Sequence, residues 1–186
     1  MKELIIPTNV TKLGYQCFAY CSSLTTLIIP TSVVEIGDEC FFRCEQLKEL
    51  IIPTTITKLG EWCFANCLSL TSLIIPTSVV EIGVKCFCNM ASLKSIELPT
   101  SVTKFGFSLF SNCSSLTSIT LHDNYNEVKD ADFMYCSSLR SIVLPSSVTK
   151  IGNSGFAFCR SLTSIDLDNI KEYERSCFCG TDITQK

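Results

Sequence analysis

A period of 23 residues runs through the whole sequence and constrains its fold more than any other feature. Prolines recur at positions 7, 30, 53, 76, 99 and 145, glycines recur at 14, 37, 60, 83, 106 and 152, and phenylalanines and leucines follow the same step. Seven full units and a degenerate eighth account for residues 1–186 and leave no linker or second domain. Because one such unit cannot bury its apolar residues alone, the sequence predicts a single domain of stacked coils, a solenoid.

Residues 24–47 show how the two strands of a unit are encoded. Residues 27–29 are apolar, include two isoleucines and stop at Pro30, which predicts a short strand. Residues 33–36 alternate in polarity before Gly37 and predict a second short strand. Each coil is therefore expected to contribute one strand to each of two columns.

The rest of the unit predicts a helical turn. Phe41, Cys44 and Leu47 follow one another at steps of three, a spacing that suits a turn of α-helix or 3₁₀-helix. The apolar positions of the unit form one inward set, which stacked coils can bury at the strand spacing of about 4.8 Å. That set is Leu24, Leu27, Ile29, Val33, Ile36, Cys40, Phe41 and Cys44.

The unit resembles the BspA-type leucine-rich repeat, whose pattern runs L-x-x-I-x-I-P-x-S-V-x-x-I-G-x-x-A-F-x-x-C-x-x-L, and it does so over nearly the whole chain. In residues 24–47 the matching positions are Leu24, Leu27, Ile29, Pro30, Ser32, Val33, Ile36, Gly37, Phe41, Cys44 and Leu47. The departure is a cysteine where the family carries alanine, at Cys17, Cys40, Cys63 and Cys86.

This resemblance implies a fold and a broad role. The implied fold is an α/β leucine-rich-repeat solenoid, a horseshoe or right-handed superhelix with a parallel concave β-sheet of short strands and helical or 3₁₀ turns on the other sides. Members of the family are surface and adhesion molecules of anaerobic bacteria and protists, and many bind host matrix proteins. The resemblance therefore implies a binding scaffold.

Charges alternate with a second period of 46 residues. The position two before each glycine alternates between lysine and glutamate: Lys12, Glu35, Lys58, Glu81, Lys104, Glu127, Lys150 and Glu172. Stacked like charges about 5 Å apart would repel, and the alternation turns each repulsion into attraction. A recent tandem duplication explains the same pattern, since residues 10–37 and 56–83 agree at 22 of 28 positions. Both explanations stay open.

Thirteen cysteines mostly occupy two repeat positions. A zinc site is disfavoured because the close pairs are spaced i,i+4 or i,i+2, with no C-x-x-C and with His122 as the only histidine. Stacked cysteines could form a disulfide ladder, but the odd count and the interruptions at Met90, Leu109 and Gly155 argue against one. We expect reduced, buried thiols that pack as small apolar residues with a weak donor.

Composition excludes several classes of function. Charged residues make up 18% of the chain and the formal net charge is −3, without basic clusters, so no nucleic-acid partner is expected. No apolar run reaches the roughly 18 residues of a membrane span. Residues 1–7 lack the features of a signal peptide. Together with reduced thiols this predicts a cytoplasmic protein, whereas the family resemblance favours the cell surface.

No catalytic, metal or cofactor site is expected. Residues 122–132 collect acids and amides in the unit that has lost its proline and glycine, but they lack the spacing of a calcium loop. A solvated bulge in a degenerate repeat is the simpler interpretation. His122 alone offers no Ser-His-Asp or Cys-His arrangement. We therefore expect no enzyme activity, no metal and no cofactor.

The concave face is the candidate binding site. Outward strand positions begin with an isoleucine stripe at Ile5, Ile28, Ile51 and Ile74, which ends at Glu97. An exposed apolar ladder on a sheet indicates a partner or an aggregation hazard. Alternatively, the isoleucines serve strand propensity and are shaded by neighbours such as Lys48. The candidate binding residues are Ile5, Ile28, Ile51, Ile74, Glu49, Glu97, Lys48 and Lys94.

The sequence thus predicts a non-catalytic scaffold that binds a protein through its concave strand face, without naming the partner. The alternative is an architectural or adhesive segment of a longer surface protein that binds host or matrix proteins. The chain also enters on strand residues 4–6 without a polar capping unit. We therefore expect self-association through the N-terminal end or through the isoleucine stripe.

Overall fold

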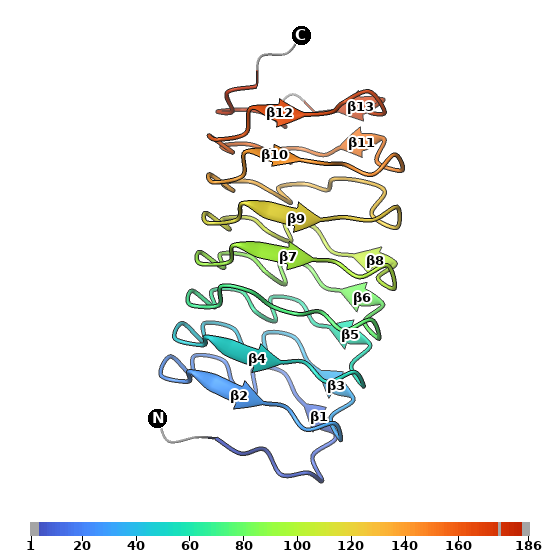
Figure 1. Ribbon diagram of the computed structural model, residues 1–186. Helices are drawn as coiled ribbons and strands as arrows, with labels where there is room; N and C mark the ends of the chain where they lie inside the picture. The colour runs from blue at the N-terminus through green and yellow to red at the C-terminus, as the bar shows by residue number, and fades with distance from the viewer. Residues whose placement is uncertain (1–3, 175, 184–186) are drawn as a thin grey trace.

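Two columns of short parallel strands run along the molecule, on two sides of the coils (Figure 1). The computed structural model describes residues 4–174 and 176–183. The first column consists of β2 (Thr26–Ile28), β4 (Glu49–Ile51), β7 (Ser95–Glu97), β9 (Ser118–Thr120), β10 (Ser141–Ile142) and β12 (Ser164–Ile165). The second consists of β1 (Lys12–Leu13), β3 (Glu35–Ile36), β5 (Lys58–Leu59), β6 (Glu81–Ile82), β8 (Lys104–Phe105), β11 (Lys150–Ile151) and β13 (Glu172–Tyr173). Two strands per unit are confirmed in most coils, but among the described residues 71–76 form no strand and Val128 makes only an isolated bridge to Ile151.

The register of the first column follows the sequence period. β2 pairs with β4 in parallel, so that Thr26 lies beside Glu49, and Ile5 extends this ladder through a bridge to Ile28. The other pairs are β7 with β9 and β10 with β12. A proline follows β2, β4, β7 and β10 closely, as Pro30 follows β2, and it ends these strands because it cannot donate to the ladder.

The second column holds the coils closest together. Five of its strands pair in the order β1-β3-β5-β6-β8, and β11 pairs with β13. The glycines that follow β3, β5, β6, β8 and β11 are explained by a close approach to the preceding coil. A Cβ atom at Gly106 would lie 2.4 Å from the backbone nitrogen of Val84 and 2.5 Å from the carbonyl carbon of Gly83. Any side chain there would push the two coils apart.

The predicted helical turns are wrong. No helix occurs in residues 4–174 or 176–183, and none of these residues belongs to a helix long and apolar enough to cross a membrane. The segment around Phe41 is instead a run of hydrogen-bonded turns, in which the Phe42 amide donates to the Glu39 carbonyl at 3.0 Å. The alternate amides of this segment, those of Glu39, Phe41 and Arg43, donate to carbonyls of the next coil.

Left-handed residues are the physical reason for this difference. Glu39 and Arg43 have φ values of 55° and 59°, and the matching pairs from Gln16 and Tyr20 to Ser154 and Phe158 are also left-handed although none of these residues is glycine. A left-handed residue at every fourth position interrupts the run of negative φ values that a helix requires, so a helix cannot propagate. The three-residue spacing therefore arises from repeated tight turns.

The core is a single column of apolar side chains inside the coils. The predicted inward set of residues 24–44 is buried throughout. Phenylalanines from successive coils stack nearly parallel, as between Phe41 and Phe64, with ring centroids 5.5 Å apart and an interplanar angle of 2°. The stack runs from Phe18 to Phe178. The residues of the first strand column that point away from this core form the candidate site.

Candidate functional site

The outward residues of the first strand column form what we call the isoleucine face. It comprises Ile5, Ile28, Ile51, Ile74, Glu97, Thr120, Val143 and Asp166. Alternation along each strand turns the residues on either side of these into the core, as the exposed-buried-exposed pattern of β2 and β4 shows. The structure therefore places the predicted stripe outward on consecutive coils.

The four isoleucines of this face are strongly exposed. Their relative exposures run from 66% at Ile51 to 84% at Ile74. Neighbours such as Lys48 therefore shade these side chains only in part, and a role of the isoleucines in strand propensity stays open. Isolated exposed aliphatic residues are common on protein surfaces, but four in one row present a contiguous apolar surface to solvent.

The isoleucine face is hollowed along its length. One groove of about 550 Å³ lies among Ile5, Ile28 and Ile51, with Glu49 on its wall. A second of about 490 Å³ lies where the apolar half of the face meets its polar half, between Ile74 and Glu97. A third, of about 470 Å³, lies beside His122 and Val143.

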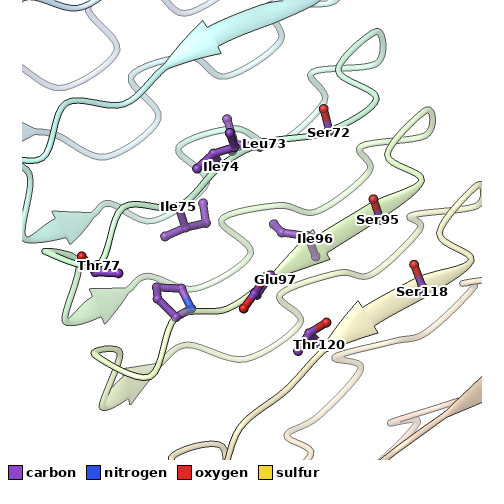
Figure 2. A pocket seen from close by; sticks show the side chains of 11 residues that line it. Ser72, Leu73, Ile74, Ile75, Thr77, Ser95, Ile96, Glu97, Ser118 and Thr120 are labelled. Carbon is purple, nitrogen blue, oxygen red and sulfur yellow. The ribbon is translucent and has the colours of Figure 1, made fainter.

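The middle groove combines apolar and polar groups. Figure 2 shows Ser72, Ser95 and Ser118 in a row on consecutive coils, beside Ile74 and the carboxylate of Glu97. Hydroxyl groups in such a row can donate or accept hydrogen bonds, while the isoleucine offers an apolar contact. This arrangement suits binding of a polypeptide surface with both kinds of group.

The charged candidate residues border the face. The Glu97 side chain is 69% exposed, and its Oε1 lies 3.6 Å from Nε2 of His122 on the next coil. Lys48 and Lys94 are exposed at the start of the neighbouring strand segments, one residue before Glu49 and Ser95 respectively. The structure thus places all eight predicted site residues on or beside one side of the molecule.

The second strand column carries the alternating charges. Lys12 Nζ lies 2.7 Å from Glu35 Oε1, and Lys58 Nζ lies 2.7 Å from Glu81 Oε1. Glu81 also accepts Lys104 at 3.6 Å, so that one carboxylate serves the coils on both sides. The hydrogen bond from Lys58 and its positive charge lower the pKa of Glu81. The predicted attraction between alternating charges is confirmed as ion pairs.

The thiols pack inside the coils rather than forming a reactive cluster. All thirteen cysteines are free, and nine are buried. In the recurring column, Cys44 Sγ donates to the Phe18 carbonyl at 3.1 Å and Cys67 Sγ donates to the Phe41 carbonyl at 3.2 Å. Burial raises the pKa of Cys44 to about 12, which suppresses the nucleophilic thiolate. The predicted burial is confirmed for these nine cysteines and the weak donor role for the recurring column, while the redox state of the thiols stays a prediction.

Asp132 is a buried polar residue that sequence reasoning misplaced. It was expected in a solvated bulge, yet Asp132 and Tyr125 are both fully buried. The carboxylate accepts the Tyr125 hydroxyl at 2.5 Å and the backbone amides of Lys129 and Leu109 at 2.8 and 3.0 Å. Its position is that of Cys86 in the repeat, which is an inward position. The 23-residue register of the sequence therefore indicates that Asp132 is buried.

Burial changes the pKa of the Asp132 carboxyl group. Loss of solvation raises the pKa of Asp132 to about 6, against the lowering effect of its three hydrogen-bond donors. The Asp132 carboxyl group lies in the core and lines none of the three grooves described above, and its raised pKa bears on the stability of the fold. In residues 4–174 and 176–183, no group of three or more histidine, cysteine or acidic side chains could hold a metal ion.

Comparisons with known proteins agree with this architecture. The family described as BspA type leucine rich repeat region matches residues 1–114 and 80–185, with six copies. A solved leucine-rich repeat protein from Bacteroides ovatus is 30% identical with a TM-score of 0.87, and the match covers 94% of this chain and 45% of that one. The chain therefore spans less than half the length of that relative.

Two further solved structures are similar. A leucine-rich repeat protein from T. pallidum is 28% identical with a TM-score of 0.76, over 83% of this chain and 72% of that one. A leucine-rich cell surface protein from Faecalibacterium prausnitzii is 26% identical with a TM-score of 0.66, over 92% of this chain and 61% of that one. None of the curated proteins matches. With the family pattern matched along nearly its whole length, the chain belongs to the BspA-type leucine-rich repeat family.

Proposed function

We propose that this protein is a non-catalytic scaffold that binds a protein partner on its isoleucine face. The observation that carries the proposal is the row of Ile5, Ile28, Ile51 and Ile74, all at least 66% exposed on consecutive coils. Burying such a row against a partner removes apolar surface from water at about 25 cal/mol per Å². Exposed apolar rows of this kind mark interaction surfaces.

The grooves supply specificity to this contact. The apolar groove at Ile28 accepts aliphatic or aromatic side chains, while the middle groove adds the Glu97 carboxylate and the serine row. A partner that fits presents apolar side chains toward Ile28 and Ile51, and hydrogen-bonding or basic groups toward Glu97. Lys48, Glu49 and Lys94 belong to the polar rim that surrounds the buried centre of an interface.

Affinity capture from a lysate of the source organism tests the proposal. The test variant carries lysine on the face, as Ile28→Lys, Ile51→Lys and Ile74→Lys. The matched control carries lysine at the exposed valines of the second column, as Val34→Lys and Val80→Lys, which are 55% and 46% exposed in the native chain. We expect the wild type and the control to capture the same protein and the face variant to lose it. Equal capture by all three would contradict the proposal.

An architectural or adhesive role at the cell surface is the second candidate. It is favoured by the likeness to the leucine-rich cell surface protein of Faecalibacterium prausnitzii. The free thiols favour a reducing compartment instead. Labelling of intact cells with a membrane-impermeant amine reagent separates these two locations, because only a surface protein would be labelled before lysis.

A further inference from the structure

Ile28, Ile51 and Ile74 lie on three successive coils of the isoleucine face, and we call them the central row. Ile28 pairs with Ile51 across β2 and β4, so their coils are separated by the strand spacing of about 4.8 Å. The grooves of the face follow this row, since one is lined by Ile28 and Ile51 and the next by Ile74 and Glu97. A segment that contacts all three isoleucines therefore lies along the solenoid axis, across the strands.

The coils of this row are not evenly spaced. Residues 71–76 form no strand, so β4 has no strand partner on that side. The core widens at the same place: the ring centroids of Phe64 and Phe87 lie 6.2 Å apart, against 5.5 Å for the pair before and 5.4 Å for the pair after. The three steps along the row from Ile28 to Glu97 therefore run short, long and short.

One face of an α-helix has the same sequence of steps. Its residues i, i+3, i+7 and i+10 lie at about 0, 4.5, 10.5 and 15 Å along the helix axis, because each residue rises by about 1.5 Å. An extended chain places side chains of one face about 6.7 Å apart at every step, and it is out of register by the second isoleucine. The central row therefore fits the apolar stripe of a helix better than it fits an extended segment.

Glu97 occupies the fourth position of the row and changes its chemistry. Figure 2 shows Ile74 and Glu97 on neighbouring coils, with Thr120 on the coil after them. The Glu97 side chain is 69% exposed and lies 3.6 Å from His122, and Glu81 shows that a carboxylate of this fold can pair with two cations. A lysine or arginine at i+10 can pair with Glu97, whereas an apolar residue there would remove water from the carboxylate without replacing its hydrogen bonds.

We propose that the segment bound by this face is an amphipathic α-helix of another protein, which lies along the solenoid axis. Its residues i, i+3 and i+7 are apolar and cover the central row, and its residue i+10 is basic and pairs with Glu97. A helix of the opposite direction has the basic residue first and the apolar residues three, seven and ten positions later. A second copy of this chain offers no helix in residues 4–174 or 176–183. The proposal rests on the proposed function and specifies the partner's structure.

Selection from two displayed libraries tests the shape of the partner. One library randomises an exposed face of a stable helical scaffold, and the other randomises an exposed strand of a β-hairpin scaffold. Both are selected on the wild type, and binders are kept only if the Ile28→Lys, Ile51→Lys, Ile74→Lys variant loses them and the Val34→Lys, Val80→Lys control retains them. We expect the helical library to yield such binders, with three apolar residues and one basic residue at the stated spacing.

A charge exchange tests the direction and register of the helix. Fluorescence anisotropy measures the binding of one selected helical binder to the wild type and to the Glu97→Arg variant. Loss of an exposed ion pair should weaken binding by about two- to five-fold. A binder with glutamate in place of its basic residue should show the reverse preference. The same affinity of the original binder for both proteins, or an exchange that fails to restore binding, would overturn the assigned register.

The helix and the proposed function can fail separately. A helical library without binders that depend on the central row, or with binders of a different spacing, would overturn the helix whatever the lysate capture shows. Capture that the face variant loses, together with binders from the hairpin library alone, would leave the scaffold function standing and make the partner an extended segment. Equal capture by all variants would contradict the proposed function itself.

Discussion

The buried carboxyl group of Asp132 predicts a distinctive pH dependence of stability. Its pKa is raised from an ordinary value of 3.8 to about 6, because burial removes the solvation of the charged form. The folded protein therefore binds this proton more tightly than the unfolded chain does. The contribution to stability is fully present below about pH 4 and is lost as the pH rises to about 6. At about 1.4 kcal/mol per pKa unit, the free energy of unfolding falls by about 3 kcal/mol between about pH 3 and about pH 7.

Replacing the group by Asp132→Asn isolates this effect. The amide keeps the size of the side chain and does not titrate, so the pH-dependent loss should vanish while every other carboxyl group titrates as before. Urea unfolding of both proteins between about pH 3 and about pH 7 gives the two profiles. We expect the wild type to lose about 3 kcal/mol more than the variant across this range. Parallel profiles would refute the assignment of a raised pKa to Asp132.

Three further predictions concern the core, the charge ladder and the thiols. Phe64→Ala should lower the free energy of unfolding by about 3–5 kcal/mol, several times more than Cys63→Ala, because it removes one ring from the stack; urea unfolding measures both. The triple variant Glu35→Lys, Glu81→Lys, Glu127→Lys should lose about 1–3 kcal/mol of its free energy of unfolding at low salt and recover most of it at high salt. Equal stability at both ionic strengths would leave the alternation of charges as a mark of duplication. A thiol reagent should react rapidly with the exposed Cys17 and Cys179 and reach all thirteen cysteines only after denaturation, whereas five or six intact disulfides under non-reducing conditions would contradict the free thiols.

The fold was predictable because its determinants repeat. A proline that ends each first strand, such as Pro30, and a glycine that permits close approach, such as Gly106, act through local sterics and return every 23 residues. Period-2 alternation then decides which strand residues face outward. The exposure of Ile28 and Ile51 follows directly from that alternation. The candidate face was therefore accessible from sequence alone.

The turn side was not predictable in the same way. Left-handed residues there include Glu39, Trp62 and Lys85, which carry no common chemical signal for positive φ. The repeated asparagines at positions 66, 89 and 112 were the available hint, since asparagine tolerates that conformation best after glycine. Spacing by three fits a tight turn as well as a helix. The choice between them depends on hydrogen bonds to the next coil, which only the stacked structure defines.

Asp132 escaped prediction for a related reason. An acid in a polar segment normally lies in solvent, and the sequence around it has lost the proline and glycine that mark the register. Counting 23 residues forward from Leu109 nevertheless assigns Asp132 to an inward position. The buried acid is tolerated because Tyr125 and two backbone amides donate to it. In this coil, the repeat position of Asp132 predicts its burial, whereas the polar residues around it do not.

Hydroxyl-radical footprinting of the complex with the captured protein tests the binding face most directly. The method measures the solvent exposure of individual side chains, and the native exposures of Ile28, Ile51 and Ile74 are large. Binding on the isoleucine face predicts that oxidation of these three residues falls on complex formation, while Val34 and Val80 on the other column stay as reactive as in the free protein. Protection of the two valines with unchanged oxidation of the isoleucines would contradict it.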